Sequence, residues 1–362
     1  MKAGIVGLVG CGKTVIFNAI TGLNAPVHAY STGSKSETNI ASVIVNDERV
    51  NFLSNLYKPK KTVYANFELV DVTMPGKELG AKDNSKSELL NSLRQCDALI
   101  HVINCFEEKN GDDYLNAFKD IETEMILSDL STVDKRLTKL TNDVKRAQGN
   151  EKSQLINEQE LLQRFYSHLE EEKPIRNLEL SNEELKIIKG YTFLSEKKML
   201  VVANIGEKDL NAENNPKLAK LKAFLASNNI PYVEFCGQIE MELKQLPPSD
   251  KQELMESLGI KEEITDKLIE KCYKLLNLIS FFTVGEDEVK AWTIPNNSVA
   301  TEAARKIHSD IARGFIRAEV IHFSDLVKFG HWNLAKENGA LKLEGKEYLM
   351  RDGDCVNFRY NV

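Results

Sequence analysis

Apolar residues along this chain gather into short runs separated by segments with helical spacing. Nearly continuous apolar runs over 3–6, 98–104 and 199–203 predict strands buried on both faces, as in the centre of a parallel sheet. Alternating apolar and polar positions over 40–45 and 64–70 predict two half-buried strands. Helical segments between them complete a strand and helix alternation. This order predicts a doubly wound α/β sheet.

A glycine-rich turn joins the first strand to the first helix. Gly7-Leu8-Val9-Gly10-Cys11-Gly12-Lys13-Thr14 fits the phosphate-loop pattern G-x-x-x-x-G-K-[ST]. Glycines let backbone N–H groups approach phosphate oxygens, and the following helix N-terminus is positive. In this pattern the lysine contacts the β- and γ-phosphates and the hydroxyl binds Mg²⁺. The predicted nucleotide-binding residues here are Val9, Gly10, Cys11, Gly12, Lys13, Thr14 and Val15.

Long, charged sequence follows between about residues 114 and 190. Apolar residues recur every three or four positions there, first over 126–140 and again over 155–169, with a break at Gly149-Asn150. The pattern predicts two amphipathic helices folded into a hairpin or coiled-coil arm. Most of its charges are expected to form a solvated face.

The last part of the chain changes to short strands and turns. A helix is predicted over 301–311, and strands over 280–284, 289–294, 315–320, 348–350 and 356–360. Short strands around one helix predict a small α+β domain of the β-grasp kind. The expected domains are a P-loop nucleotide-binding domain over 1–113 and 191–278, a helical arm over 114–190 and a β-grasp domain over 279–362.

Charge and cysteine content limit the partners and the cellular compartment that we expect for this protein. The 362 residues are 42% hydrophobic and 28% charged, with a net charge of −7, so no global basic excess favours nucleic acid or an anionic membrane. Six scattered cysteines without a C-x-x-C pair argue against a disulfide framework or zinc site and fit a reducing cytosol. No signal or spanning segment is predicted. We expect a cytoplasmic monomer without a membrane partner; direct nucleic-acid binding, through short lysine clusters, stays open.

Magnesium is the expected cofactor. Asp71 ends the predicted strand over 64–70, where nucleotide hydrolases with this loop place the carboxylate that holds Mg²⁺ through water. Thr14 and Asp71 are therefore the predicted metal-binding residues, and Lys13 and Asp71 the predicted catalytic residues. A solvated aspartate at a strand end is the alternative interpretation of Asp71.

Residues after two later strands are candidates to hold the base. Asn204-Ile205-Gly206-Glu207 stands where a guanine pocket normally has N-K-x-D, whose aspartate accepts from guanine N1–H and N2–H₂. Glu207 is one methylene longer than aspartate and Ile205 replaces the lysine, so the sequence favours ATP over GTP. The predicted base-side residues are Asn204, Ile205, Glu207, Cys236, Gly237 and Gln238.

With these motifs the chain resembles the YchF / Obg-like ATPase family, P-loop proteins of the translation-factor class with a helical arm and a carboxy-terminal TGS domain. The resemblance runs nearly end to end and includes 67–71, 121–124 and Ala203-Asn204 with Glu207. It is most specific over 282–286, 289–294, 314–320 and 352–354. The resemblance implies ATP binding with weak base discrimination, slow Mg²⁺-dependent hydrolysis, and association with ribosomes and stress responses.

Three departures from the family pattern concern hydrolysis. Met74 stands where the family's D-x-x-G step has glycine, and Lys35 aligns with a switch threonine that Thr32, Ser34, Ser36 or Thr38 would have to replace. A histidine linked to hydrolysis is expected after the strand over 98–104, but residues 106–121 contain none. His101, within that strand, is expected in the core rather than as a base. Binding residues match, whereas hydrolysis stays open.

Cys11 lies inside the phosphate loop and raises a second question. Loop amides and Lys13 are expected to lower the pKa of its thiol, so that oxidation would block the phosphate site. The alternative, which we favour, is a small loop residue without a redox role.

Two functions remain after this reading of the sequence. One is an ATPase switch whose nucleotide state is communicated to a ribosomal partner. The other is a non-hydrolysing ATP-binding interaction protein.

Overall fold

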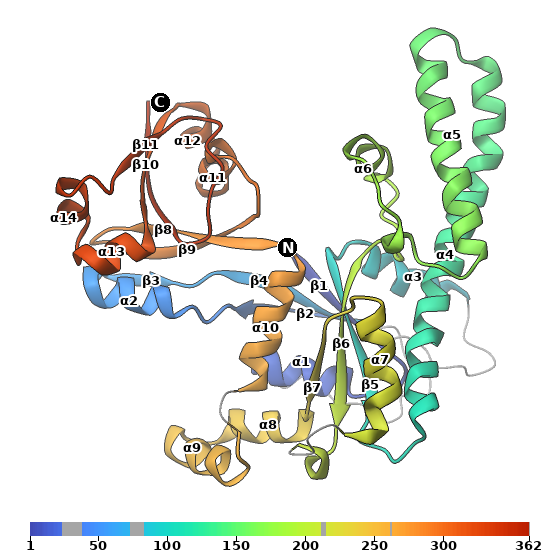
Figure 1. Ribbon diagram of the computed structural model, residues 1–362, viewed down its shortest axis with the longest axis horizontal. Coiled ribbons are helices and arrows are strands. Elements are labelled where there is room, and N and C mark those ends of the chain that lie inside the picture. Colours follow the sequence, from blue (N-terminus) through green and yellow to red (C-terminus); the bar gives the residue numbers. More distant parts are fainter. Residues whose placement is uncertain (24–37, 73–82, 211–214, 261–262, 362) are drawn as a thin grey trace. The chain divides into compact units, whose positions relative to one another are not determined.

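The computed structural model describes residues 1–23, 38–72, 83–210, 215–260 and 263–361 (Figure 1). The chain divides into two compact units, which we call the first and the second unit. The first contains Met1–Ala41 and Glu68–Thr265, and the second contains Ser42–Phe67 and Asp266–Val362.

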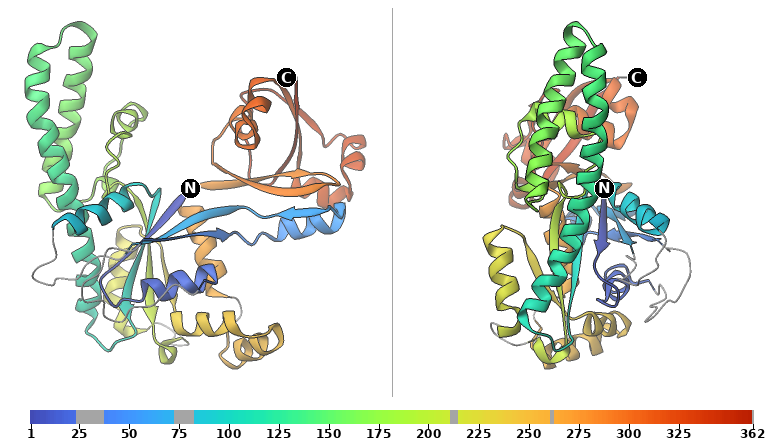
Figure 2. Two further views of the ribbon diagram at one scale, coloured as in Figure 1. Left: turned by 180° about the vertical axis from the view of Figure 1, so that it is seen from behind. Right: turned by 90° about the vertical axis from the view of Figure 1, so that its right-hand side faces the viewer.

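A six-stranded sheet forms the centre of the first unit. Its order is β2-β4-β1-β5-β6-β7, and β1 pairs in parallel with both β4 and β5. The strands are β1 (Lys2–Val6), β2 (Thr38–Ile44), β4 (Asn66–Val72), β5 (Ala98–Cys105), β6 (Lys198–Ile205) and β7 (Tyr232–Phe235). Helix α1 (Lys13–Thr21) lies on the opposite side of the sheet from α4 (Gly111–Arg146) and α7 (Ala219–Ser227) (Figure 2). This arrangement confirms the predicted doubly wound α/β sheet.

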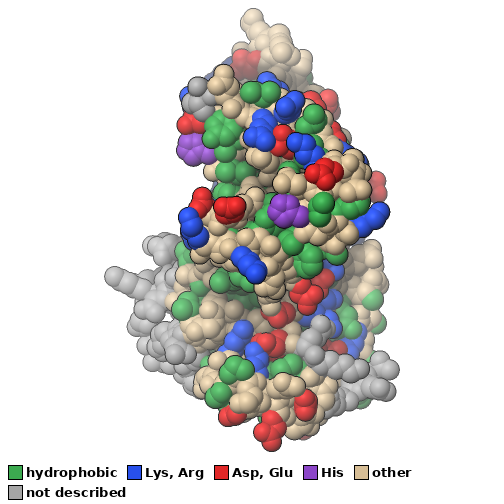
Figure 3. Space-filling view, turned by 90° about the vertical axis from the view of Figure 1, so that its left-hand side faces the viewer, with side chains coloured by type: hydrophobic (Ala, Val, Ile, Leu, Met, Phe, Trp, Pro, Cys, Tyr) green, Lys and Arg blue, Asp and Glu red, His purple; other side chains and the backbone are tan. Residues whose placement is uncertain are grey.

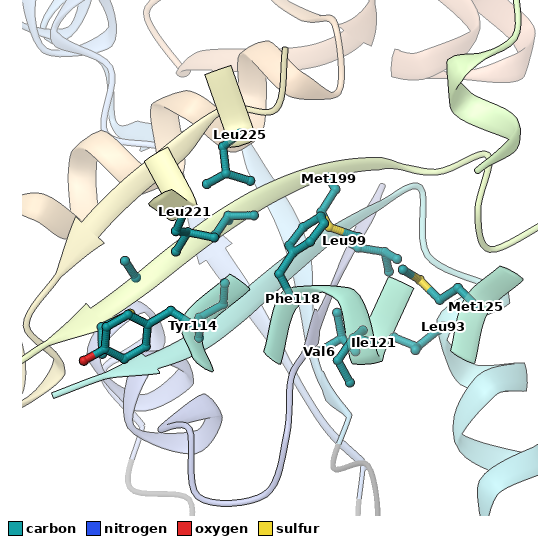
Figure 4. Packing of buried hydrophobic residues seen from close by; sticks show 14 of the residues in the cluster. Val6, Leu93, Leu99, Tyr114, Phe118, Ile121, Met125, Met199, Leu221 and Leu225 are labelled. Carbon is teal, nitrogen blue, oxygen red and sulfur yellow. The ribbon is translucent and has the colours of Figure 1, made fainter. Parts of the chain in front are cut away.

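The first half of α4 packs against the sheet. Tyr114, Phe118, Ile121 and Met125 are each at most 2% exposed and meet apolar side chains of β5, β6 and α7 (Figure 4). Their spacing of three or four residues places them on one face of the helix, which is why this half of α4 is buried.

The second half of α4 and α5 (Gly149–Glu170) form the arm. Leu140, Leu162 and Phe165 are fully buried between the two helices, as the periodicity predicted. The returning chain, for which the sequence predicted no separate elements, contains the 3-10 turn η1 (Ile175–Asn177), α6 (Asn182–Ile188) and then the segment with Phe193. Ile175 and Phe193 join the same apolar cluster, so the returning chain supports both arm helices.

Hydrogen bonds join the middle of α4, at the base of the arm, to α3 and to the segment before β6. Asp129 of α4 is buried and accepts from the backbone N–H groups of Leu194 and Ser195, at 3.0 and 2.7 Å. Arg94, the last residue of α3 (Asp83–Arg94), donates to the same carboxylate at 3.1 Å. Burial nonetheless raises the pKa of Asp129.

Further helices follow near the end of the first unit. They include α9 (Pro248–Ser257), and α10 (Ile264–Leu275) continues from Thr265 into the second unit. Helix α8 (Gly237–Gln245) was not predicted, although Ile239 and Leu243 have helical spacing. A 3-10 turn, η3 (Pro216–Leu218), leads into α7.

A second six-stranded sheet forms the centre of the second unit. Its order is β11-β10-β12-β8-β9-β3. The strands are β3 (Lys61–Val63), β8 (Leu278–Val284), β9 (Glu288–Pro295), β10 (Phe315–His322), β11 (Lys342–Glu344) and β12 (Asp354–Tyr360). Consecutive residues Phe281 and Phe282 belong to different apolar clusters, so this sheet has a core on each face.

Parts of the carboxy-terminal prediction were wrong. Residues 348–350 form no strand but only an isolated bridge between Val299 and Leu349. The helix expected over 301–311 breaks at His308, whose φ of −162° is extended, into α11 (Ala300–Ile307) and α12 (Ser309–Arg313). Two further short helices, α13 (Phe323–Phe329) and α14 (Trp332–Glu337), cover the sheet.

Residues 42–67 pack with the carboxy-terminal part of the chain. Helix α2 (Glu48–Tyr57) buries Val50 and Leu53 completely in one of the two cores of the second unit. Strand β3 adds to the edge of its sheet, parallel to β9, with Lys61 opposite Glu288. Residues 42–67 therefore belong to the second compact unit.

The apolar content of the helices and the distribution of surface charge bear on possible partners. No helix in the described ranges combines the length and apolar content needed to span a membrane. On the face of the molecule in Figure 3, basic and acidic side chains are interspersed rather than gathered by sign.

We expect Leu53→Ala to destabilise the second unit by about 2–5 kcal/mol, because it leaves a cavity in a fully buried position. Urea denaturation followed by tryptophan fluorescence measures this loss. Val327→Ala is the control, since Val327 is 46% exposed, and it should change the unfolding free energy by less than about 0.5 kcal/mol. Equal effects of the two substitutions would contradict the packing of α2.

Candidate phosphate-binding site

The loop between β1 and α1 requires glycine at two positions of close approach. A Cβ on Gly7 would lie 2.4 Å from the carbonyl oxygen of Val102 in β5. A Cβ on Gly12 would lie 2.2 Å from Nδ2 of Asn204, and Gly12 has a φ of +95°. Larger side chains would therefore push the loop away from the ends of β5 and β6.

Lys13 begins α1 and its side chain lies under the loop. It is 5% exposed, and Nζ donates to the carbonyl oxygens of Gly7 and Leu8, at 2.9 Å each. The ammonium group is thus held at the inner side of the loop, close to the helix N-terminus. Both features attract anions.

Thr14 and Asp71 come together although they are far apart in sequence. The parallel register of β1 and β4 places Asp71 opposite Ile5, at the end of β1 that leads into the loop. The Thr14 hydroxyl donates to Oδ2 of Asp71 at 3.0 Å. Asp71 is fully buried, and its Oδ1 has no hydrogen-bond partner among the described residues.

The pKa of Asp71 is raised. Burial is the main cause, and the hydrogen bond from Thr14, the charge of Lys13 and a side-chain interaction with Asn39 only partly offset it. A buried carboxylate oxygen without a partner is unusual and indicates a site for an additional donor or a cation.

Asn204 braces the loop from the end of β6. Its Nδ2 donates to the carbonyl oxygen of Cys11 at 3.0 Å, and its Oδ1 accepts from the backbone N–H of Gly237 at 3.2 Å. The side chain is only 5% exposed. It therefore connects the loop, β6 and α8 through both ends of one carboxamide, a role that the sequence prediction missed.

The other predicted base-side residues occupy different environments. Ile205 and Cys236 are buried, at 3% and 1% exposure, within the core of the first unit. A Cβ on Gly237 would lie 2.8 Å from Cγ1 of Val15, so α8 starts directly against α1. Glu207, which begins the 3-10 turn η2 (Glu207–Asp209), and Gln238 are exposed.

In the loop itself, Val9 and Gly10 are exposed, whereas Cys11 is only 2% exposed. Its thiol pKa is raised, contrary to our expectation of a lowered value. Burial outweighs the opposing effects of Lys13 and of the backbone hydrogen bonds. The thiol is therefore protonated near neutral pH, which argues against a reactive thiolate in the loop.

His101 lies in the core, as expected. It is 1% exposed and stacks on Phe118 with ring centroids 5.2 Å apart. Burial lowers the pKa of His101 to about 3, with the nearby charges of Arg176 and Lys13 acting in the same direction. The ring is neutral near pH 7 and is packed away from the loop surface.

Some predicted features lie outside the described residues. These are Met74 and the switch-loop positions Thr32, Ser34, Lys35 and Ser36. The side chain of Thr38 is not described either. Within the described part of the chain, no group of three or more histidine, cysteine, aspartate or glutamate side chains is arranged to hold a metal ion.

Two family models match parts of this chain. Residues 2–156 match a family model described as a 50S ribosome-binding GTPase, and residues 278–361 match the YchF-GTPase carboxy-terminal model, described as a protein of unknown function (DUF933). The Bacillus subtilis (strain 168) protein named ribosome-binding ATPase YchF is 38% identical, with 100% of each chain covered. The chain belongs to the YchF family.

Other YchF proteins are similar over the same extent. The Haemophilus influenzae protein, also named ribosome-binding ATPase YchF, is 37% identical over 100% of this chain and 99% of its own. The solved structure of the Schizosaccharomyces pombe YchF GTPase is 30% identical, with a TM-score of 0.85 over 99% of this chain and 97% of that chain. The YchF resemblance found in the sequence is thereby confirmed.

All six cysteines are buried, and burial raises the pKa of each thiol. Because thiolates are the reactive form and their fraction grows only as pH rises toward the pKa, we expect almost no alkylation by iodoacetamide at pH 7.5. Intact-mass spectrometry checks this, with the urea-unfolded protein as control, which should gain six adducts. Rapid addition of one adduct to the folded protein would contradict the protonated Cys11.

Proposed function

We propose that this YchF-family protein binds ATP with Mg²⁺, hydrolyses it slowly and acts as a nucleotide-dependent switch on the ribosome. The contact between Thr14 and Asp71, beside the buried Lys13, carries this proposal. It brings the two predicted metal-binding residues and the predicted phosphate-binding lysine to one loop. Association with the ribosome is supported by the names of the bacterial relatives. We place the protein in the cytoplasm for the same reason.

Lys13 would act by exchanging partners. Its ammonium group donates to the carbonyl oxygens of Gly7 and Leu8, and a phosphate oxygen would replace one of these neutral acceptors with a charged one. Charge-assisted hydrogen bonds of this kind are roughly twice as strong as neutral ones. Lys13 thereby favours a triphosphate over a neutral ligand.

The residues present fit a magnesium ion. The Thr14 hydroxyl and the unpartnered Oδ1 of Asp71 are oxygen ligands of the type that Mg²⁺ prefers, Asp71 acting through water. Few protein ligands are needed, because Mg²⁺ with a nucleotide is held largely by phosphates and water. When bound, the ion would neutralise charge on the phosphate oxygens.

The base side favours adenine in this proposal. Glu207 is exposed at the end of β6, and its carboxylate can accept from the amino group of adenine. Asn204 would position the loop rather than contact the base, since its carboxamide already bonds to Cys11 and Gly237. GTP is the less favoured nucleotide, although the Schizosaccharomyces pombe relative is named a GTPase.

A non-hydrolysing ATP-binding protein is the second candidate. It is favoured by the neutral, buried His101 and by the absence of histidine from residues 106–121. The two candidates share nucleotide binding and differ only in phosphate release.

Titration with ATP and GTP in Mg²⁺, with calorimetry and phosphate release followed on the same sample, separates them. We expect ATP to bind more tightly than GTP. We also expect the protein to hydrolyse ATP slowly and so to release phosphate. Lys13→Ala should weaken ATP binding about 10- to 150-fold, because it removes charged hydrogen bonds worth about 1.5–3 kcal/mol. Lys173→Ala, on an exposed lysine of the arm, is the control and should change neither quantity.

Binding without phosphate release above the Lys13→Ala background would favour the second candidate. Absence of binding by either nucleotide to folded protein would contradict both.

Asp71→Asn tests the metal assignment. We expect the increase in ATP affinity caused by Mg²⁺ to disappear, because the carboxylate that orders the metal's water is lost. A raised folded pKa means that Asp71 stabilises the fold at low pH and that this contribution is lost as pH rises above the unfolded value. At pH 7 the substitution should therefore leave the unfolding free energy equal or higher.

Calorimetry with and without Mg²⁺ and urea denaturation at pH 7 measure the two effects of Asp71→Asn. Asp134→Asn is the matched control, since Asp134 is an exposed aspartate on the arm. A variant that keeps its Mg²⁺ dependence, or that loses several kcal/mol of stability, would contradict the assignment.

A further inference from the structure

Two strands cross the division between the two units. Strand β2 has its first four residues in the first unit and continues into the second from Ser42. Strand β4 runs the other way, leaving the second unit at Phe67 and returning to the first at Glu68. Residues 42–67, which we call the connecting segment, are thus joined to the first unit at both ends.

The return strand ends at the candidate site. Asp71 follows Glu68 by three residues in the same strand, and it accepts the hydrogen bond from Thr14. Because both lie on one strand, a shift of Asp71 along β4 also shifts the end of the connecting segment.

The connecting segment is part of the core of the second unit. Val50 and Leu53 of α2 are 0% exposed, and Ala65 is 3% exposed, all in one apolar cluster with Phe282. The backbone N–H of Val45 donates to the carbonyl oxygen of Ala65 at 2.8 Å, so the two ends of the segment are paired. Close-packed interiors resist sliding, so this segment and its surroundings move together.

One arginine links α2 to the carboxy-terminal strands. Arg49 contacts Asp352 with Nη1 and Oδ2 2.7 Å apart, and Asp352 Oδ1 accepts from the backbone N–H of Ser280 at 2.8 Å. The guanidinium carbon also lies 5.1 Å from the ring centroid of Phe282. Arg49 therefore joins the connecting segment to β8 by both charge and ring contacts.

We propose that the connecting segment transmits nucleotide binding at Thr14 and Asp71 to the core of the second unit. This inference rests on the proposed function, because it needs a nucleotide to change the position of Asp71. A ligand shifts such an arrangement only through contacts that differ between two states, and Mg²⁺ with a triphosphate at Asp71 supplies that difference. The second unit thus senses the nucleotide through its own core.

The chain contains its own probe for this coupling. Both of its tryptophans, Trp292 and Trp332, lie in the second unit, and the first unit has none. Trp292 donates to Thr283 Oγ1 at 3.0 Å and lies 3.7 Å from Lys290 Nζ, whereas Trp332 packs at the cluster that holds α2. Changes in tryptophan emission therefore report on the second unit alone.

The experiment titrates full-length protein with ATP and Mg²⁺ under selective excitation of tryptophan, and repeats the titration by calorimetry. We expect the emission to change and to saturate with the same Kd as calorimetry. Arg49→Ala should reduce the amplitude at least about twofold at unchanged Kd. Arg359→Ala is the matched control, because it removes an arginine pair with Glu319 at 3.0 Å in the same unit, and it should keep the full amplitude.

Unchanged emission while calorimetry shows ATP binding would overturn the inference and leave the proposed function intact. An Arg49→Ala amplitude equal to that of Arg359→Ala would overturn the role of Arg49. If Arg49→Ala fails to fold, Arg49→Lys replaces it, since lysine keeps the charge but cannot reproduce the paired contacts. Absence of ATP binding in any form would remove the proposed function and this inference together.

Discussion

The close approach of three main-chain segments is the constraint on which the candidate site depends. The phosphate loop contacts Val102 of β5 at Gly7 and the side chain of Asn204 at Gly12, with no space for a Cβ at either position. Because β1 lies between β4 and β5, the same strand that positions the loop also brings Asp71 to it. The loop, Asp71 and Asn204 are therefore positioned by the parallel registers of neighbouring strands.

Two charged groups at the loop, Asp71 and Lys13, lie in unusual electrostatic surroundings. One carboxylate oxygen of Asp71 has no hydrogen-bond partner among the described residues, and the Lys13 ammonium group donates to two neutral carbonyl oxygens. Neither group is in the environment that would satisfy it best. By contrast, Asp129 at the base of the arm has an arginine and two backbone donors, as a structural carboxylate should. The two aspartates therefore differ in how completely their carboxylate oxygens are hydrogen-bonded, although both are buried.

Local patterns in the sequence predicted the phosphate loop, the central strands and the arm, because each depends on neighbouring residues. The packing of residues 42–67 could not be predicted from local patterns, because α2 and β3 contact residues more than two hundred positions later. The brace by Asn204 was missed for the same reason, as its partners come from the loop and α8. The prediction of a lowered Cys11 pKa counted nearby charge but not burial, which only the fold determines.

The packing of residues 42–67 also affects how the protein is made. Lys61 must pair with Glu288, and α2 must cover a core built from the last hundred residues, so these early segments leave the ribosome long before their partners exist. Domains generally fold in order during synthesis, but this unit has to wait for the end of the chain. Its nascent amino-terminal segment carries apolar side chains that stay uncovered during that interval, and contacts so distant in sequence form slowly.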